Sequence, residues 1–290
     1  MSIELIDVTY TYMKKTPFEK TALKNIKLKI SDREFLAIAG HTGSGKSTLI
    51  QLIAGLMPPT IGNVLVDDVD LASKNKAAIR QAKLNVGIVF QYPEMQLFEE
   101  TVEKDIAFGP KNLNLDEAEI NRRIDESLNL VGLSKNIKNI SPFSLSGGQK
   151  RKVAIAGILA MRPKYLILDE PTAGLDPKSR DEMLNNIQKL HEEQGITIIL
   201  VSHSPDDIAK VADRVVILSQ GEVLADDTPR KIFSKTDILK TAGLLPPLAA
   251  QLLMALKSDG LEVSTNALKI EEAEEIIELY IKNQLGKNSS

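Results

Sequence analysis

Three short stretches of this 290-residue sequence hold residue types suited to phosphate chemistry. Residues 40–47 read Gly-His-Thr-Gly-Ser-Gly-Lys-Ser, residues 145–149 read Leu-Ser-Gly-Gly-Gln, and residues 166–170 end in Asp-Glu. Glycine-rich turns let successive backbone N–H groups converge on phosphate oxygens, while a lysine neutralises the terminal phosphates and a hydroxyl binds magnesium. Together the three stretches predict a machine driven by a nucleotide.

The first stretch has the sequence context that phosphate binding requires. Phe35–Ala39 is a continuous apolar run typical of a buried strand. Residues 47–54 have the pattern of a helix, whose N-terminus would direct its positive end toward an anion. Lys46 is placed to neutralise the terminal phosphates, and the Ser47 hydroxyl to bind magnesium. The competing interpretation is a flexible glycine turn.

A carboxylate pair, Asp169 and Glu170, follows a second predicted strand at residues 165–168. A magnesium-associated carboxylate and a catalytic base belong at this position in nucleotide-hydrolysing folds. Read alone, the pair could simply cap the next turn, because Pro171 and Gly174 crowd the residues that follow. The glycine-rich loop elsewhere in the chain favours the catalytic interpretation.

The Leu-Ser-Gly-Gly-Gln stretch predicts a second anion site on the same chain. It opens a predicted helix at residues 149–161, so free backbone N–H groups lie beside the Ser146 hydroxyl. A second site would be redundant if both sites faced one nucleotide. Two chains arranged head to tail would instead let each stretch close over the other chain's phosphate loop.

Composition and charge limit the class of protein. The chain is 43% hydrophobic, enough for one large domain and an appendage, and its net charge is −3. That balance offers no bulk attraction to nucleic acid or anionic lipid, so no nucleic-acid partner is expected. The sequence has no cysteine, which excludes disulfides and thiolate sites. No secretory signal is visible, and residues 241–256 are too short and proline-interrupted to cross a bilayer.

Alternating apolar strands and helices predict an α/β protein with a mostly parallel core sheet and an antiparallel β edge. The expected strands are 3–10, 26–30, 35–39, 64–66, 86–90, 165–168, 197–201, 215–218 and 222–225. The clearest helices are 149–161, 180–191 and, in a mostly helical insert, 116–131. A small helical appendage begins near residue 227. It includes helices at 248–256 and 270–285, the latter with an apolar side of Ile270, Ala273, Ile276, Ile277 and Tyr280.

The order of these motifs resembles the nucleotide-binding subunit of ABC transporters over roughly residues 3–230. The resemblance rests on the three stretches above, on Gln91 after a strand, on Gly-Leu-Asp at 174–176, and on His203. It implies a P-loop ABC ATPase fold, with an ATPase domain at 1–230 that contains a helical subdomain at about 92–162. Residues 231–290 would form a C-terminal appendage that serves dimerisation. ATP and Mg²⁺ are the implied cofactors.

The resemblance assigns nucleotide contacts to two groups of residues. Tyr12 is implied to stack on adenine, although Tyr10 and Phe18 are close enough in sequence to do so instead. The phosphates would be held by Gly40, His41, Thr42, Gly43, Ser44, Gly45, Lys46, Ser47 and Thr48. The second anion site would consist of Ser146, Gly147, Gly148 and Gln149.

The same resemblance implies the catalytic and metal roles. Gln91 would ligate magnesium, together with Ser47, and report to a transport partner. Asp169 would hold magnesium through water, and Glu170 would polarise the attacking water. His203 would contact the γ-phosphate and position that water.

A narrower resemblance, to the ATPases of energy-coupling factor transporters, rests mainly on the sequence at the end of the predicted strand at residues 86–90 and after it. Residues 90–98 read Phe-Gln-Tyr-Pro-Glu-Met-Gln-Leu-Phe, and residues 101–102, 105–110 and 141–143 also match this group. Within it, Gly-Pro-Lys-Asn at 109–112 resembles the second of two paralogous ATPases. One departure from ABC proteins in general is Lys-Arg-Lys at 150–152, where many have x-Gln-Arg, and another is Gly157 in place of a common arginine.

This narrower resemblance implies an ATP-hydrolysing subunit that powers uptake of vitamins or transition-metal ions. Its implied partners are a paralogous ATPase in a heterodimer, a transmembrane coupling subunit and separate substrate-binding membrane subunits. The implied location is peripheral, on the cytoplasmic face of the cell membrane. The alternative is a soluble ABC ATPase acting outside transport, which would usually show tandem cassettes, a long coiled-coil insertion or a basic surface.

The loop after Gln91 is a candidate groove for the coupling helices of a transmembrane partner, because it carries Tyr92, Met95 and Phe98. The alternative is that Phe98 and Phe108 are ordinary core residues.

Overall fold

The computed structural model describes residues 1–287 and divides into two compact units. One unit comprises Met1–Phe35 and Ser47–Val201, and the other comprises Leu36–Lys46 and the chain from Ser202 onward. The division falls inside strand β3 (Phe35–Ala39) and after the first residue of helix α1 (Lys46–Ile53). Both elements flank the glycine-rich loop, which therefore lies in the second unit, and the chain returns to the first unit at Ser47.

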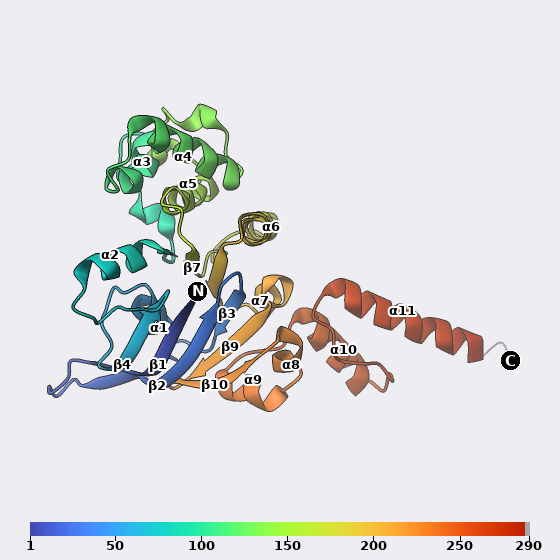
Figure 1. Cartoon of the computed structure of the whole chain (residues 1–290). Coiled ribbons are helices and arrows are strands. Elements are labelled where there is room, and N and C mark those ends of the chain that lie inside the picture. The colour runs from blue at the N-terminus through green and yellow to red at the C-terminus, as the bar shows by residue number, and fades with distance from the viewer. Residues whose placement is uncertain (288–290) are drawn as a thin grey trace. The chain divides into compact units, whose positions relative to one another are not determined.

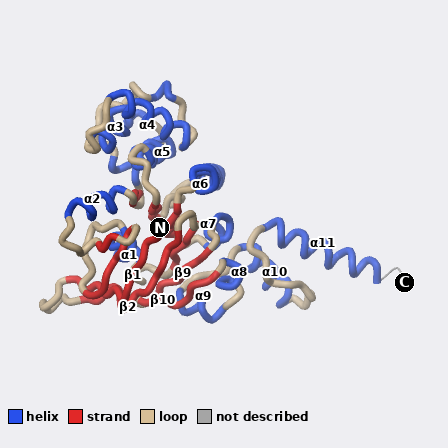
Figure 2. Tube along the Cα trace, in the orientation of Figure 1, coloured by secondary structure: helices blue, strands red, loops and turns tan. Residues whose placement is uncertain are grey.

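The first unit carries a four-stranded antiparallel sheet in the order β2-β1-β4-β5. Its strands, among those drawn in red in Figure 2, are β1 (Ser2–Tyr12), β2 (Lys20–Ser31), β4 (Ile61–Val66) and β5 (Val69–Asp70). Burial alternates along β2, where Leu23, Ile26, Leu28 and Ile30 point inward. This sheet confirms the predicted antiparallel edge, although β1 and β2 extend beyond the predicted strands.

Three parallel strands of the first unit position the carboxylate pair. β7 (Tyr165–Asp169) pairs with β6 (Val86–Val89) on one side and β8 (Thr197–Val201) on the other. Tyr165 to Leu168 and all of β8 are buried, as expected for parallel strands covered on both faces. Helices α2 (Lys76–Leu84) and α6 (Pro177–Gln194) also belong to this unit.

The helical insert of the first unit is built from α3 (Val102–Lys111), α4 (Glu117–Leu130) and α5 (Gly147–Leu159), which pack against one another (Figure 1). Each helix begins at a capping side chain, respectively Thr101, Asp116 and Ser146. Short 3₁₀ turns connect them: η1 (Pro93–Gln96), η2 (Lys135–Ile137) and η3 (Pro142–Ser144). The predicted helices at 116–131 and 149–161 are confirmed within two residues.

The second unit continues β3 beside β9 (Arg214–Ser219) in parallel, and β10 (Glu222–Asp227) pairs with β9 antiparallel. Its first helices are α7 (Pro205–Val211), α8 (Pro229–Phe233) and α9 (Thr236–Ala242). They share one core with the strands, in which Ile208, Ile232, Phe233 and Leu239 pack with Ala39. The strand that leads to the phosphate loop is therefore held by a rigid apolar core.

Helices α10 (Leu248–Ser258) and α11 (Ile270–Lys287) share a smaller core centred on Leu253 and Ala273. Ile276, Ile277 and Tyr280 pack against it, as predicted. Ile270 begins the helix, one turn before Ala273, and is 56% exposed. Across residues 1–287, no helix combines the length and apolar character that a membrane span needs.

Candidate nucleotide-binding site

The glycine-rich loop is a tight cradle in the second unit. Gly40 has φ +147°, and a Cβ on it would lie 2.1 Å from the Leu218 carbonyl oxygen, so no side chain fits there. Lys46 folds back over the loop, its Nζ donating to the carbonyl oxygens of Gly40 at 2.7 Å and His41 at 3.0 Å. Within residues 1–287, the buried Ser44 hydroxyl has no hydrogen-bond partner. A buried hydroxyl of this kind, in a loop that leads into the N-terminus of a helix, suits a ligand oxygen.

In the first unit, the start of α1 lies against the end of β1. The Tyr12 hydroxyl is 3.0 Å from the Thr48 hydroxyl, and the Tyr12 ring meets Tyr10 edge-on at 4.8 Å. Ser47, just before Thr48, is exposed. Phe18, the other aromatic residue considered for adenine, is 77% exposed. Tyr12 is thus the aromatic side chain with a direct contact to the helix that follows the phosphate loop.

The carboxylate pair ends strand β7 in a constrained conformation. Asp169 is the last residue of the strand, and the Glu170 backbone N–H donates to the Val201 carbonyl oxygen at 2.9 Å. Glu170 has φ +51°, a left-handed conformation that costs a residue with a side chain about 1 to 2 kcal/mol. The cap of the next helix is Asp176, whose carboxylate accepts from Ser179 N–H at 3.1 Å. Asp176, and not the carboxylate pair, therefore caps this helix.

Gln91 comes from the neighbouring strand. β6 and β7 run parallel with Val89 opposite Leu168, so Gln91 and Asp169 emerge from the same end of adjacent strands. The Gln91 side chain is exposed. The structure thus brings Gln91 to the end of the first unit's parallel strands where the carboxylates lie.

His203 lies in the second unit, two residues after β8 ends. The Ser202 N–H donates to the Ile38 carbonyl oxygen at 3.2 Å, which sets the His203 loop beside the strand leading into the phosphate loop. Ser204 caps α7 by accepting from Asp207 N–H at 3.3 Å. His203 itself is exposed.

The Leu-Ser-Gly-Gly-Gln stretch forms an exposed helix N-terminus in the first unit. Ser146 Oγ accepts from Gln149 N–H at 3.3 Å, and Gln149 Oε1 accepts from Ser146 N–H at 3.1 Å. The Ser146 O–H is left to donate outward. Among the described residues, no atom lies within 4 Å of a Cβ built on Gly147 or Gly148. The positive end of the 13-residue helix α5 is therefore open to an anion brought from outside.

Exposed apolar side chains surround this helix group. Phe98 and Phe108, 57% and 50% exposed, meet edge-on at 5.1 Å, so the alternative that they are ordinary core residues is wrong. Tyr92 and Met95 are also exposed, in agreement with the predicted surface loop. The sequence interpretation gave no role to Phe143, which is 62% exposed three residues before Ser146. Its only signal was an apolar residue in a polar, proline-containing turn.

Sequence interpretation also missed a pair inside the first unit, Arg151 and Glu94. Arg151 is 3% exposed and forms a two-pronged ion pair with Glu94. The departure at residues 150–152 was the signal that could have drawn attention to it.

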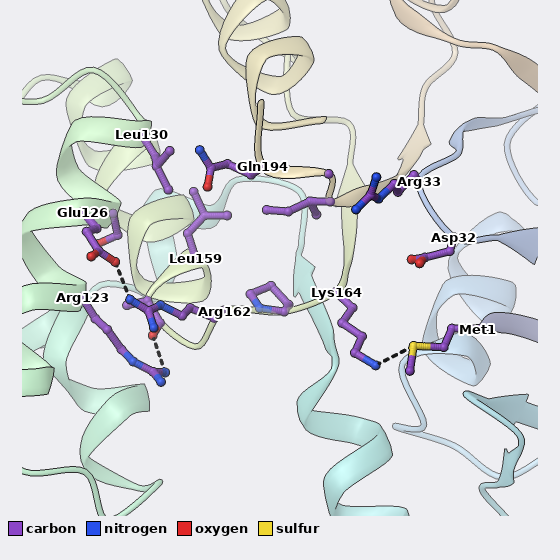
Figure 3. Close-up of a pocket in the computed structure, with 15 residues that line it drawn as sticks. Met1, Asp32, Arg33, Arg123, Glu126, Leu130, Leu159, Arg162, Lys164 and Gln194 are labelled. Carbon is purple, nitrogen blue, oxygen red and sulfur yellow. Dashed lines mark hydrogen bonds and ion pairs between the residues drawn. The ribbon is translucent and has the colours of Figure 1, made fainter. Parts of the chain in front are cut away.

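A separate cavity of about 390 Å³ in the first unit lies away from all of these residues (Figure 3). It is lined by basic side chains that already have acidic partners: Arg162 contacts Glu126 at 2.6 Å and Lys164 contacts Asp67 at 2.9 Å. None of the predicted site residues lines it, so it is not the predicted nucleotide site.

Comparison with known proteins identifies the family. Residues 23–173 match the family model described as ABC transporter. The chain is 52% identical to the energy-coupling factor transporter ATP-binding protein EcfA2 of Clostridium tetani over 282 residues, 97% of this chain and 98% of the relative. It is 51% identical to the protein of the same name from Clostridium perfringens over 284 residues, 98% and 99% of the two chains.

Two solved structures resemble the fold. One is cbiO1 from Clostridium perfringens, described as part of the ABC transporter complex cbiONQ. Its TM-score is 0.73 and its sequence identity 37%, and the match covers 82% of this chain and 92% of that chain. The other is the dimeric ATP-binding cassette MJ0796 in a post-hydrolysis state with ADP and Pi. Its TM-score is 0.69 and its sequence identity 32%, and the match covers 78% of this chain and 98% of that chain. These likenesses confirm the predicted P-loop ABC ATPase fold. The chain belongs to the ABC transporter family and, within it, to the energy-coupling factor transporter ATP-binding proteins.

Proposed function

We propose that this chain is the ATP-binding and ATP-hydrolysing subunit of an energy-coupling factor importer, which powers uptake of vitamins or transition-metal ions. The observation that carries the proposal is the near-complete match to proteins named as ATP-binding subunits of such transporters, on a chain that retains Glu170 and His203. A subunit without hydrolytic function would not need either residue. ATP hydrolysis coupled to transport is the activity of this family.

Phosphate binding is assigned to the loop from Gly40 to Thr48. The Ser44 hydroxyl, buried without a partner among the described residues, and the Lys46 ammonium, which folds back onto Gly40, are the donors in the second unit that support this assignment. The Lys46 contacts to loop carbonyls can be exchanged for stronger contacts to phosphate oxygens, because charge-assisted hydrogen bonds exceed those to neutral acceptors. Adenine stacking is assigned to Tyr12, which already contacts the helix that follows the loop.

Hydrolysis is assigned to Glu170 as the group that polarises the attacking water, with His203 orienting it toward the γ-phosphate. The strained backbone of Glu170 and its N–H hydrogen bond to Val201 fix the main-chain position from which the carboxylate extends before ATP binds. Preorganised groups of this kind cost no rearrangement during the reaction, and phosphoryl transfer depends mainly on position and electrostatics.

Magnesium binding is assigned to Ser47, Gln91 and Asp169. Their hydroxyl, amide and carboxylate oxygens are the hard donors that Mg²⁺ prefers, and few protein ligands suffice because Mg²⁺ keeps several waters. Bound with ATP, the ion would neutralise charge on the phosphates. Gln91 and Asp169 emerge from the same end of adjacent strands, which suits a shared ligand.

Two chains are proposed to close head to tail. The exposed N-terminus of α5, with Ser146, Gly147, Gly148 and Gln149, would bind the phosphates held by the partner chain's loop. The partner is proposed to be a paralogous ATPase, and the two composite sites would then be unequal. Residues 231–290 are proposed to form the dimerisation appendage beside an ATPase domain at 1–230. Leu279 and Ile281 lie exposed on α11, where they could join two chains.

Coupling to transport is assigned to the exposed apolar residues around the helical subdomain, at about 92–162. Tyr92, Met95, Phe98 and Phe143 would receive helices of a transmembrane coupling subunit, to which separate substrate-binding membrane proteins deliver the cargo. This arrangement places the chain peripherally on the cytoplasmic face of the membrane.

A native affinity pull-down from detergent-solubilised membranes of the source cell tests the function. We expect recovery of a paralogous ATPase, one shared transmembrane subunit and one or more small hydrophobic binding proteins. Recovery of soluble proteins alone would contradict the transport assignment and favour an ABC ATPase that acts outside transport.

A further inference from the structure

Arg151 is a buried arginine whose fork joins three segments of the first unit. Its Nε and Nη2 donate to the two carboxylate oxygens of Glu94 at 3.2 and 3.1 Å. Its Nη1 donates to the carbonyl oxygens of Pro171 at 3.0 Å and Ala173 at 2.9 Å. The planar guanidinium is the side chain that can hold a carboxylate and two carbonyls in fixed directions at once.

Each of the three segments already has a place in the proposed reaction. Arg151 lies one turn into α5, whose N-terminus carries Ser146 and the two glycines. Glu94 lies in η1, three residues after Gln91 and next to the exposed Met95. The carbonyls of Pro171 and Ala173 belong to the turn that directly follows Glu170.

We infer that Arg151 is a positioning residue that joins the Gln91 loop to the turn after Glu170, so that a shift at the partner-facing surface reaches the hydrolytic carboxylate. The inference rests on the proposed function, in which that surface meets a transmembrane subunit. A displacement of η1 moves the Glu94 carboxylate and, with it, the guanidinium. Because Nη1 holds two carbonyls of the next turn, the left-handed backbone of Glu170 moves as well.

The charges of Arg151 and Glu94 support a strong contact between the two side chains. Partial burial raises the pKa of Glu94, but the hydrogen bonds and charge of Arg151 outweigh burial and hold that pKa below its usual value. Glu94 therefore stays ionised near neutral pH. Removing the Glu94 carboxylate leaves the buried Arg151 guanidinium without this counter-ion, so the contact is costly to break.

The direct test is hydrogen exchange of the full chain, with the mutation in one segment and the readout in another. In Glu94→Gln, which keeps size and removes the charge, we expect exchange of amides in residues 172–175 to rise about tenfold, because a charge-assisted contact to Arg151 is weakened. Arg151 connects Glu94 to those residues through its hydrogen bonds to Glu94, Pro171 and Ala173. Unchanged exchange at 172–175 in a folded Glu94→Gln chain would overturn the inference. Glu126→Gln, which weakens the exposed pair with Arg162, is the matched control and should leave 172–175 unaffected.

Steady-state kinetics of the assembled complex give a second readout. Arg151→Gln, the residue type common in other ABC proteins, should lower kcat for ATP about 10- to 100-fold while KM stays within about twofold, because a misplaced catalytic group slows chemistry more than binding. Arg151→Lys, which keeps the charge, should restore part of kcat. A wild-type complex that does not hydrolyse ATP would contradict the proposed function. Wild-type turnover with an unchanged kcat in Arg151→Gln would overturn only the role of Arg151.

Discussion

The hydroxyl oxygens of Tyr12 and Thr48 lie 3.0 Å apart, joining the last residue of β1 to the first turn of α1. The aromatic ring and the helix that follows the phosphate loop are thereby held together before any nucleotide binds. Sequence alone left three aromatic residues open for the adenine contact. This hydrogen bond favours Tyr12, because Tyr10 packs behind it and Phe18 projects into solvent.

Substitutions at Tyr12 separate ring stacking from the hydrogen bond. Tyr12→Ala should weaken ATP binding about 10- to 100-fold, since stacking of a base on an aromatic ring contributes about 1 to 3 kcal/mol. Tyr12→Phe keeps the ring and should change the Kd less than about fivefold. Phe18→Ala is the control. Equilibrium binding of a fluorescent ATP analogue measures all three, and a larger loss in Phe18→Ala than in Tyr12→Ala would reassign the adenine contact.

An acidic residue at Met95 should disconnect the ATPase from its membrane partner. Met95 is 84% exposed, so Met95→Asp should leave folding and basal ATP hydrolysis within about twofold of wild type. An apolar docking surface loses affinity when a charge must be buried in it, so co-purification with the transmembrane subunit should fall at least about tenfold. Leu56→Asp, at another exposed apolar residue, is the matched control. Equal loss of hydrolysis and co-purification in Met95→Asp would argue against a docking role.

Asp67 should contribute to stability in a pH-dependent way. It accepts hydrogen bonds from the Tyr165 hydroxyl at 2.7 Å, from Lys164 Nζ at 2.9 Å and from the Asn85 amide at 2.9 Å. Burial raises the pKa of Asp67, but the hydrogen bonds from Lys164 and Tyr165 outweigh it and leave the pKa below its ordinary value. Because the folded-state pKa is the lower one, this stabilisation is complete above about pH 4 and is lost as the pH falls through the folded-state pKa.

The corresponding variant is Asp67→Asn. It should lower the Tm at pH 7 by about 2 to 6 °C, since charge-assisted hydrogen bonds are lost. The difference from wild type should shrink as the pH is lowered below about 4. Thermal denaturation followed by circular dichroism measures both, with Glu100→Gln, at an exposed pair with Lys104, as the control. A Tm difference that is constant from pH 7 to pH 3 would contradict the ionic interpretation.

Sequence reasoning was most successful where a segment is buried on both faces or capped by its own residues. Strands β3 and β8 were predicted at their observed bounds, because short, continuous, mostly apolar runs that end at Gly40 and at Ser202 permit few other structures. Helix α5 was located from Ser146, which the structure confirms as its cap. Helix α2 was missed, since only Ala82 of its nine residues is buried and its only large apolar residues are Ile79 and Leu84.

In the candidate site, too, some features could be predicted from the sequence and others could not. The residue types of the phosphate loop and carboxylate pair were readable because their chemistry is local in sequence. The link from Glu94 to Arg151 spans 57 residues and depends on how the helical group packs, which no local pattern encodes. The left-handed backbone of Glu170 could not be predicted from the sequence either, because a residue with a side chain adopts this conformation only when the surrounding structure enforces it.

The most direct test of the whole account is magnesium-dependent phosphate release by wild-type protein and by Glu170→Gln, in the assembled complex and at saturating ATP. We expect Glu170→Gln to bind ATP with an unchanged Kd and to accumulate as a closed ATPase dimer. It should release phosphate at least about 100-fold more slowly, as expected when a catalytic base is removed. Phosphate release at the wild-type rate by Glu170→Gln would contradict the assignment of Glu170 and, with it, the proposed mechanism.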